Sequence, residues 1–584
     1  MKKEWRVYSR KARINNIAAR FGILPLTANI ITCRGKVNED QIEKYLYGTM
    51  DDLHDPALMM GMDKGVEIIA EKIKAGSSIR VVGDYDADGV TSTYILLDGM
   101  RKLGANVSYD IPDRIRDGYG MNVRIVEDAA AAGVDTIITC DNGVAAVASI
   151  SKAKELGMTV VVTDHHEPQD EMPAADVIID PHQIADKYPY KEICGAMVAY
   201  KFIKALYKYM GEELPEGKYV EFAAIATVCD VMPLLDENRI LVREGLRKIL
   251  NTDNVGLKAL AEATGLPAQR KLNTRSFSFV IGPCINTKGR LESAKDVVEL
   301  FLEEDPDKAR DIAEYMVSLN NTRKEMTTEG ERPIMEMLDA KEADGTLDNV
   351  IVVYAEGLHE SLAGLVAGHI EDRFYRPAIV FTDSIVNPEV YKGSARSIEA
   401  YNVFEALCEA KEYLVKFGGH KQAAGLTIKK TDLDDLRRFL NENQHLTEAD
   451  LTAKIYIDAV EPLHNITFSL IEQLESMEPC GEGNDEPLFG APDMELYGIR
   501  IKGKNSNVME LKVRDKNGRR YSITSFRPDD VMADIKKWFN EEDCDKIMKG
   551  IAQGLFIDFT FKPYINEYMG NRTVEFLLKD YRPA

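Results

Sequence analysis

Residues 161–166 read Val161-Val162-Thr163-Asp164-His165-His166, an apolar run of strand character that ends in one carboxylate and two imidazoles. Open α/β sheets carry their chemistry at the carboxyl ends of the strands. Acidic residues also end three similar apolar runs, at 81–89, 137–143 and 225–230. We therefore expect four acidic clusters, each at the end of a strand, to meet at one edge of a sheet.

The chain around these clusters alternates between apolar strands and helices. We expect strands at 78–82, 107–111, 136–139 and 159–163, and helices at 65–74, 91–103, 123–131 and 144–156. Such alternation implies βαβ units and a mostly parallel sheet. Because βαβ crossovers are right-handed, the carboxyl ends of the strands share one edge, and acids far apart in the chain become neighbours.

The remaining chain predicts three further parts. A highly charged stretch at 299–338 has helical spacing and is expected to form long connecting helices. A second α/β region begins near residue 349, with strands at 350–354 and 377–381 and a helix at 362–373. Short strands with turns follow and fit a small barrel of the OB type; they are expected at 453–457, 495–501, 508–513, 521–524, 555–560 and 574–579.

The predicted fold class is therefore α/β: two α/β lobes joined by long helices, with an OB-fold β-barrel at the carboxy terminus. A chain of 584 residues is too long for one hydrophobic core. We expect an amino-terminal arm at 1–50, a catalytic lobe at 51–295, connecting helices at 296–345, a second lobe at 346–450 and the barrel at 451–584.

Bulk composition narrows the class of protein. The formal net charge of −23 argues against a uniformly nucleic-acid-binding surface, although binding follows local patches rather than the sum. Eight cysteines stand singly, without a Cys-x-x-Cys motif, which favours a reducing compartment over disulfides or structural zinc. The amino terminus lacks the apolar core of a signal peptide, and no apolar segment is long enough to span a bilayer. We expect a cytoplasmic protein without membrane contact.

The acidic clusters require neutralisation, because neighbouring carboxylates repel one another. Carboxylates combined with histidine suit Mn²⁺, Mg²⁺ or Zn²⁺ better than a calcium cage or a thiolate site does. Alone, the loop at 84–89 is equally well explained as an acidic helix cap, and it lacks the downstream glutamate of a calcium loop. Joined to Asp141, Asp164-His165-His166 and Asp230, it favours a two-metal phosphoesterase site, in which cations activate water and polarise phosphorus.

Several longer motifs follow one another in the chain. They are Gly-Asp-Tyr-Asp-Ala-Asp-Gly-Val-Thr-Ser-Thr at 83–93, Ile-Pro-Asp-Arg at 111–114, Asp-Gly-Tyr-Gly at 117–120, Asp-His-His at 164–166, Cys-Gly-Ala-Met-Val-Ala at 194–199, Asp-Val-Met-Pro-Leu at 230–234, Gly-Pro-Cys-Ile-Asn-Thr-Lys-Gly-Arg-Leu at 282–291, Gly-Ser-Ala-Arg-Ser at 393–397, Phe-Gly-Gly-His at 417–420 and Glu-Pro-Cys-Gly-Glu-Gly-Asn at 478–484. Together they resemble the RecJ family of single-strand-specific exonucleases, within the DHH phosphoesterase superfamily, over nearly the whole chain. The two lobes then correspond to the family's DHH and DHHA1 domains.

The resemblance implies a metal-dependent 5′-to-3′ exonuclease that degrades single-stranded DNA to 5′-mononucleotides, in DNA repair and recombination. It implies two ions, Mn²⁺ or Mg²⁺, with single-stranded DNA as substrate and a single-strand-binding protein and a helicase as candidate partners. The implied catalytic residues are Asp84, Asp86, Asp88, Asp141, His165, His166 and Asp230, all but His166 as metal ligands. The implied substrate-binding residues are Arg114, Tyr119, Asn286, Arg290, Ser394, Arg396, Gly418, Gly419 and His420, whose arginines suit bidentate binding of the 5′ phosphate.

Basic residues crowd one window of the barrel sequence, close to aromatic residues. The basic residues are Arg500, Lys502, Lys504, Lys512, Arg514, Lys516, Arg519 and Arg520, and the aromatic residues are Tyr497, Tyr521 and Phe526. The pattern suits a basic groove in which single-strand bases stack on aromatic rings. It suits a solvated strand face equally well.

Two other functions and one departure from the family pattern stay open. A DHH-type phosphodiesterase of short oligonucleotides or cyclic dinucleotides would share the acidic clusters, and a non-catalytic single-strand DNA-binding relative would share the barrel. Leu358-His359-Glu360-Ser361 stands where the family has Trp-His-x-Gly, so an acid is gained and a tryptophan and a glycine are lost. The sequence also leaves open which acid binds which metal.

Overall fold

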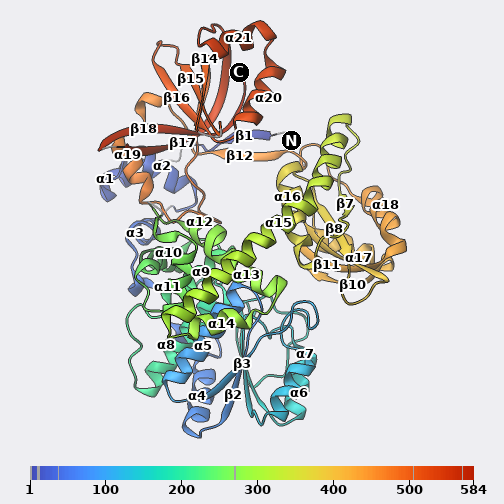
Figure 1. Cartoon of the computed structure of the whole chain (residues 1–584). Coiled ribbons are helices and arrows are strands. Elements are labelled where there is room, and N and C mark those ends of the chain that lie inside the picture. The colour runs from blue at the N-terminus through green and yellow to red at the C-terminus, as the bar shows by residue number, and fades with distance from the viewer. Residues whose placement is uncertain (1–2, 10–13, 37, 269–270, 504–505, 569) are drawn as a thin grey trace. The chain divides into compact units, whose positions relative to one another are not determined.

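The computed structural model describes residues 3–9, 14–36, 38–268, 271–503, 506–568 and 570–584. These residues form two compact units (Figure 1). One unit holds residues 49–453 and 481–483, and the other holds residues 3–48, 454–480 and 484–584. In the described ranges, no helix combines the length and the apolar character that crossing a membrane requires.

The first unit contains a five-stranded parallel sheet with the strand order β3-β2-β4-β5-β6. The chain leaves β2 for β3 on one side and returns to β4 on the other, so the loops after β2 and β4 flank a topological switch point, where open sheets bind ligands. The parallel sheet expected from the sequence is confirmed. Its strands are β2 (Ser78–Val82), β3 (Asn106–Asp110), β4 (Thr136–Cys140), β5 (Thr159–Thr163) and β6 (Val177–Ile179).

Helices cover both faces of this sheet, because side chains that alternate along each strand enter two apolar cores. Val81 and Ile138 point into the larger core, whereas Val82 and Ile137 point into the smaller one. The larger core is covered by α4 (Met62–Lys74), α5 (Ala87–Lys102) and α8 (Gly195–Met210), and the smaller by α6 (Val123–Ala131) and α7 (Val147–Glu155) (Figure 1).

The apolar run before Asp230 is a helix, α9 (Val220–Cys229), so the expectation of a strand at 225–230 is wrong. Every residue of α9 from Val220 to Val228 is buried, and the helix packs against α5, α8 and α10 (Asp236–Lys248). A short run that is apolar on all sides has no period that separates a buried strand from a buried helix. Its three alanines favour the helix.

Long connecting helices are confirmed. After α11 (Val255–Ala263), α12 (Thr274–Ser276), a π-helical turn at Phe277–Ile281, α13 (Gly282–Leu291) and α14 (Lys295–Leu302), the chain enters α15 (Pro306–Asp344), which has 39 residues. The helix α15 packs on α11 and α13, and it also sends Ile334 and Leu338 into the core of the second lobe. It therefore joins the two lobes of this unit.

The second lobe has a mixed sheet with the order β10-β11-β9-β8-β7, in which only β7 and β8 are parallel. One face carries α16, and the other carries α17 and α18. The elements are β7 (Ile351–Tyr354), α16 (Ala363–Phe374), β8 (Ala378–Asp383), β9 (Val390–Arg396), α17 (Val403–Glu409), β10 (Leu414–Gly419), β11 (Ala423–Lys429) and α18 (Leu433–Asn443).

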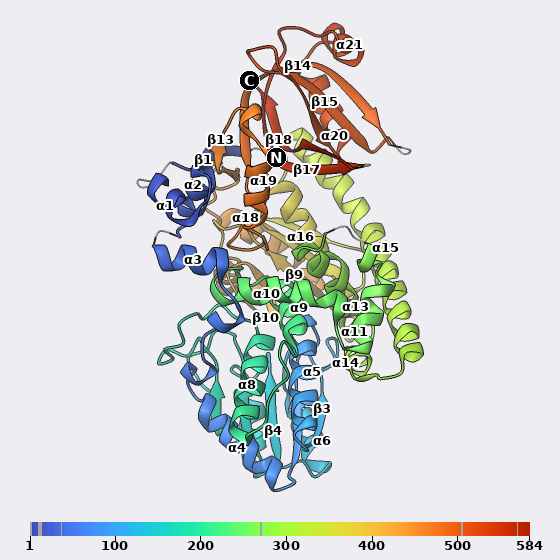
Figure 2. The same ribbon diagram turned by 90° about the vertical axis from the view of Figure 1, so that its left-hand side faces the viewer.

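The second unit contains a closed five-stranded barrel, because β14 pairs with both β15 and β17 around the order β14-β15-β16-β18-β17. This confirms the OB-type barrel. Figure 2 shows α21 (Glu541–Lys549) at one end of the barrel and α19 (Phe468–Glu475) toward the other. The remaining elements are β13 (Ala459–Val460), β14 (Phe489–Lys502), β15 (Val508–Arg514), β16 (Arg520–Ser525), α20 (Pro528–Trp538), β17 (Phe556–Tyr568) and β18 (Asn571–Pro583).

The amino-terminal residues belong to this second unit. Ile30 and Ile42 enter the same apolar core as α19 and the barrel strands. The strand β12 (Ala453–Ile457) pairs with β1 instead of joining the barrel, so the expectation of a barrel strand there is wrong. Of its side chains only Ile457 is buried, so β12 lacks an inward apolar face. The amino-terminal elements are β1 (Lys3–Val7), α1 (Ile14–Phe21), α2 (Pro25–Cys33) and α3 (Glu39–Tyr47).

Candidate active site

Three aspartates, Asp84, Asp86 and Asp88, follow β2 at the switch point. Asp86 caps α5, and its Oδ1 accepts the backbone N–H of Asp88 at 2.9 Å. Asp88 is buried in the first turn of α5, and its carboxylate accepts the N–H groups of Gly195 and Ala196, both at 2.7 Å. Helix N-termini therefore orient two of these carboxylates, as the partial positive charge of a helix start favours.

Other elements bring four more side chains to the same edge. Asp141 follows β4 with a φ of +58°, in the left-handed region that aspartate and asparagine tolerate best among side-chain-bearing residues. His165 and His166 follow β5, and Asp230 follows α9. A helix end and three strand ends thus converge where the sequence analysis expected four strand ends.

His165 lies at the centre of the cluster. Its Nε2 is 3.0 Å from Oδ1 of Asp141, 3.4 Å from Oδ2 of Asp88 and 3.6 Å from Oδ2 of Asp230. Three overlapping groups place their ligand atoms within 4.8 Å of one another, a spacing that can hold a metal ion. The groups are Asp141 with His165 and His166, Asp88 with His165 and Asp230, and Asp84 with Asp86 and Asp141. All seven side chains expected to be catalytic come together.

Electrostatics in the cluster call for cations. Burial, and then the charges of neighbouring aspartates, raise the pKa values of Asp84, Asp141 and Asp230 well above the usual range of aspartate. Burial lowers the pKa of His165 to about 4, so its imidazole is neutral and has a lone pair to offer. Oδ2 of Asp230 is buried and accepts no hydrogen bond from any described residue. This set of carboxylate oxygens and an imidazole nitrogen fits Mn²⁺ or Mg²⁺.

Asp164 supports the two histidines rather than joining the three groups. Its carboxylate accepts the N–H of Val144 and of His165, each at 2.8 Å, and lies 2.7 Å from Nδ1 of His166. Although burial opposes it, this last hydrogen bond raises the pKa of His166 to about 9, so His166 is protonated. The sequence analysis did not assign this positioning role. The position of Asp164 directly before the two histidines could have indicated this role.

Replacing Gly195 by alanine is expected to weaken Mn²⁺ binding by about 10- to 100-fold, the usual effect of disturbing groups that orient metal ligands. A Cβ on Gly195 would lie 2.7 Å from Cβ of Asp141 and 3.1 Å from Oδ2 of Asp88, so the start of α8 or both aspartates must shift. Isothermal titration of the metal-free protein with Mn²⁺ measures the change. The matched control is Gly368→Ala in α16, where nothing lies within 4 Å of the new Cβ. Equal affinities in the two variants would contradict the expected packing.

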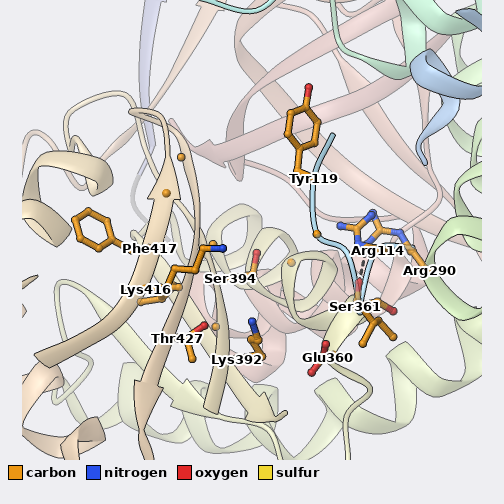
Figure 3. Close-up of a pocket in the computed structure, with 18 of the residues that line it drawn as sticks. Arg114, Tyr119, Arg290, Glu360, Ser361, Lys392, Ser394, Lys416, Phe417 and Thr427 are labelled. Carbon is orange, nitrogen blue, oxygen red and sulfur yellow. Dashed lines mark hydrogen bonds between the residues drawn. The ribbon is translucent and has the colours of Figure 1, made fainter. Parts of the chain in front are cut away.

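A cavity of about 620 Å³ adjoins the cluster, and His166 and Tyr119 line it (Figure 3). The hydroxyl of Tyr119 lies 3.1 Å from Nε2 of His166 and donates to the carbonyl oxygen of Asp141 at 2.9 Å. Of the expected substrate-binding residues, the cavity wall contains Arg114, Tyr119, Arg290, Ser394, Arg396, Gly418, Gly419 and His420. Asn286 is not in this wall. Its Oδ1 accepts the N–H of Ala87 at 2.8 Å, behind the aspartate loop.

Arginines gather in this cavity, and among the described residues no acid forms an ion pair with Arg114, Arg290 or Arg396. Nη1 of Arg290 donates to the carbonyl oxygen of Ser361 at 2.7 Å, and the guanidinium of Arg114 lies over the ring of Tyr85 at 4.7 Å. Burial, and then the positive charges of neighbouring arginines, lower the pKa of Arg290 to about 9. Burial and Arg114 also lower the pKa of Arg396. Half-buried cations for which the structure describes no acidic partner mark a binding site for an anion.

Further residues of the cavity wall were not predicted from the sequence. Lys392, Lys416 and Thr427 face the cavity from neighbouring strands of the second lobe. Glu360 also lines it, and its Oε2 accepts the N–H of Ile385 at 2.9 Å. Glu360 and Ser361, in the segment that departs from the family pattern, therefore form part of the cavity wall. The backbone carbonyl of Ser361 accepts the hydrogen bond from Arg290. The spacing of two residues from Ser394 could have identified Lys392, because alternate residues of a strand share a face.

The parallel sheet with its acidic switch point, the second mixed sheet and the barrel define the DHH class of phosphoesterases. The family model described as the DHH family, N-terminal domain, matches residues 78–227. The DHHA1 domain matches residues 347–445, and the RecJ OB domain matches residues 457–580.

Within that class, the chain belongs to the RecJ family of single-stranded-DNA-specific exonucleases. It is 34% identical over 572 residues to the single-stranded-DNA-specific exonuclease RecJ of Bacillus subtilis. The matched region covers 97% of this chain and 69% of that protein. A crystal structure of RecJ in complex with Mn²⁺ from Thermus thermophilus matches with a TM-score of 0.82 and 26% identity, over 100% of this chain and 80% of that one. A crystal structure with Mg²⁺ from the same source matches with a TM-score of 0.76 and 25% identity, over 100% and 79% of the two chains. The resemblance seen in the sequence is confirmed.

Proposed function

We propose that this chain is a metal-dependent exonuclease that degrades single-stranded DNA from its 5′ end to 5′-mononucleotides, in DNA repair and recombination. One observation carries the proposal: the acidic cluster and the arginine-lined cavity share His166, and Tyr119 of the cavity wall hydrogen-bonds to the backbone carbonyl of Asp141. A terminal phosphate bound in the cavity would present the first phosphodiester to the cluster. Cleavage would then proceed from the 5′ end and release one nucleotide at a time.

In this proposal the metal ligands are Asp84, Asp86, Asp88, Asp141, His165 and Asp230, which would hold two Mn²⁺ or Mg²⁺ ions. When bound, such ions generate a nucleophile from water at neutral pH and stabilise charge on the phosphorus. The chain contributes protonated His166, which Asp164 and Tyr119 orient. His166 would donate a hydrogen bond to a phosphate oxygen or to the leaving oxygen.

The cavity residues would set the polarity of the enzyme. Arg114, Arg290 and Arg396 present guanidinium groups whose planar donor pairs match a phosphate dianion. Ser394 and His420 add polar groups, and Gly418 and Gly419 let the backbone approach the strand. The ring of Tyr119 is 52% exposed and would face the first nucleotide. For Asn286 we propose a positioning role, through its bond to Ala87 in the aspartate loop.

The rival functions fit the molecule less well. A cyclic dinucleotide has no terminal phosphate, so a hydrolase of such molecules would leave the arginine cavity without a ligand. A non-catalytic DNA-binding relative would retain a buried group of carboxylates that is costly without metal. Both rivals predict no stepwise release of mononucleotides from a long strand.

Product analysis tests the proposal. A long single strand labelled at its 5′ end should release labelled mononucleotide at once with Mn²⁺, whereas a 3′-labelled strand should shorten progressively before its label appears as mononucleotide. Duplex of the same sequence and a cyclic dinucleotide serve as the comparison substrates. Rapid hydrolysis of the cyclic dinucleotide with no release from the strand would favour the first rival, and binding without hydrolysis would favour the second.

The basic window of the barrel is less cationic than the sequence suggests. Lys502 and Lys512 pair with Glu510, and Arg514 pairs with Glu495. Lys504 lies outside the described residues. The residues of this window for which the structure describes no ion pair, which we call the barrel patch, are Arg500, Lys516, Arg519 and Arg520.

The double substitution Arg519→Ala and Arg520→Ala is expected to weaken binding of single-stranded DNA and to lower the slope of log affinity against log salt by about one to two, as phosphate contacts do. Arg520 also lies 5.5 Å from the ring of Tyr497, where it would support base stacking. Fluorescence anisotropy over a salt series measures both quantities. The control is Arg572→Ala in β18, whose guanidinium pairs with Glu472. An unchanged slope would assign the barrel patch to a solvated strand face.

Three further expectations are proposals, the first from the resemblance and the other two from the sequence itself. The protein partners are a single-strand-binding protein and a helicase, the location is cytoplasmic, and the domain boundaries are 1–50, 51–295, 296–345, 346–450 and 451–584. Co-purification with tagged chain from cells tests the first of these. Limited proteolysis, which cuts between compact domains, tests the boundaries.

A further inference from the structure

The cavity continues beyond the residues proposed for the terminal phosphate. On the sheet of the second lobe, Ser394 pairs with Gly425 and Gly425 with Gly418, which forms one row across three strands. A second row lies beside it, in which Lys392 pairs with Thr427 and Thr427 with Lys416; we call it the lysine row. Rows of the same face are two residues apart, which is about 6.5–7 Å along a strand.

Lys392 and Thr427 of the lysine row lie at the end of the cavity opposite Tyr119, and the side chain of Lys416 reaches toward Ser394. Figure 3 shows Tyr119 at one end, Lys392 and Thr427 at the other, and Ser394 between them. Gly418 and Gly425 have no side chains, so the first row leaves the cavity wall flat beside the lysine row. The whole cavity of about 620 Å³ equals roughly twenty water molecules of the liquid, far more than one phosphate group needs.

The positive charge of the cavity wall, like the volume of the cavity, exceeds what one phosphate group requires. Among the described lining residues, and apart from His166, five are lysines or arginines, namely Arg114, Arg290, Lys392, Arg396 and Lys416, and one is a carboxylate, Glu360. No ion pair is described for Lys392 or Lys416 in the parts of the chain that the structure covers. A terminal monophosphate carries at most about two negative charges. The cavity therefore has positive charge in excess of what a monophosphate neutralises.

We propose that the lysine row binds the additional phosphates of a 5′-triphosphate, so that the enzyme accepts strands with this end as well as 5′-monophosphate strands. This proposal rests on the proposed exonuclease function. In the first cleavage, water adds to the phosphorus of the first internucleotide linkage and the bond from that phosphorus to the 3′ oxygen breaks. The 3′ oxygen takes up a proton, the first residue leaves as a nucleoside 5′-triphosphate, and the shortened strand keeps a 5′-monophosphate.

The test compares two DNA strands of one sequence, with a 5′-triphosphate and with a 5′-monophosphate, on the full chain with Mn²⁺. For the wild type we expect a kcat/KM for the triphosphate strand at least equal to that for the monophosphate strand, and a deoxynucleoside triphosphate as the first product. In the double variant Lys392→Ala and Lys416→Ala, the ratio of the two kcat/KM values should fall by about tenfold or more, from loss of charge-assisted hydrogen bonds. The control variant Lys411→Ala, an exposed lysine outside the cavity, should leave the ratio unchanged.

Other results overturn the proposal. They are a wild-type ratio well below one, a first product that is only a monophosphate, or a ratio that the double variant leaves unchanged. Free deoxyadenosine triphosphate is added in a second arm. The free triphosphate could inhibit degradation of the monophosphate strand by the wild type but not by the double variant, while both proteins have the same ratio of the two kcat/KM values. In that case the lysine row binds free nucleotides and not strand ends. Failure of the wild type to degrade even the monophosphate strand would instead refute the proposed function.

Discussion

Replacing Asp141 by asparagine is expected to reduce Mn²⁺-dependent nuclease activity at least about thousandfold, since metal ions contribute several kcal/mol to stabilisation of the transition state. Asp141 belongs to two of the three ligand groups, and its Oδ1 lies 3.0 Å from Nε2 of His165. Asparagine keeps the shape of the side chain and tolerates the φ of +58°. Initial rates on a 5′-phosphorylated single strand, over a Mn²⁺ series, measure the loss.

Melting temperatures distinguish loss of the metal site from unfolding of the Asp141→Asn variant. Without metal, the Asp141→Asn variant should melt no lower than the wild type, because one charge leaves a buried group of carboxylates whose pKa values are raised by burial and mutual repulsion. Mn²⁺ should raise the melting temperature of the wild type, as a ligand of the folded state does, and should raise that of the variant less. The control is Asp128→Asn in α6, whose exposed carboxylate pairs with Arg124. A variant that keeps its activity, or gains as much from Mn²⁺ as the wild type, would refute the metal site.

Replacing Arg396 by alanine is expected to lower the preference for 5′-phosphorylated over 5′-hydroxyl strands by about 10- to 100-fold, the range for losing hydrogen bonds between a charged donor and an anion. Arg396 is placed beside Ser394 on β9, and its Nη1 donates to the backbone carbonyl of Ala395 at 2.8 Å. Arg396 lines the cavity on the same face of β9 as Ser394. Competition between the two strands in one reaction measures the preference directly.

A second arginine in the same lobe provides the comparison for Arg396. Arg373 in α16 forms two hydrogen bonds with the carboxylate of Asp339, at 2.8 and 2.9 Å, and does not line the cavity. Arg373→Ala should leave the preference for a 5′ phosphate unchanged. If both variants keep the preference, the arginine cavity does not bind the terminal phosphate, and the proposed polarity would need another origin.

Much of the first lobe was predictable because its signals are local. The strands at 78–82 and 159–163 and the helix at 123–131 have the bounds that apolar runs and helical spacing indicate. Parallel strands buried on both faces are continuously apolar, and the turns between them are polar, so the boundaries are sharp. The same reasoning brought the aspartates after β2 and β4 together, because crossovers of one hand put strand ends on one edge.

Local signals were insufficient in two places. The run before Asp230 carries the same apolar composition as a buried strand, and only its packing among α5, α8 and α10 identifies it as a helix. The strand β12 is recognisable from its residues, but its partner is β1, more than four hundred positions away in the chain. Pairing between distant strands depends on which edge is available, and that is a property of the folded chain.

The amino-acid order alone predicted the α/β class and the barrel from short-range periodicity, and it singled out the seven acidic and imidazole residues from the ends of apolar runs and from the resemblance to the RecJ family. It did not reveal that Asp164 holds His166 by a 2.7 Å contact, that Asn286 supports the aspartate loop, or that Lys392 and Lys416 flank Thr427 in the cavity. The contacts of Asn286 and of the two lysines join side chains from separate elements, and the contact of Asp164 depends on how the loop after β5 folds. Only packing of those elements sets such distances, since a residue's own neighbours in the chain carry no information about what another strand or helix brings beside it.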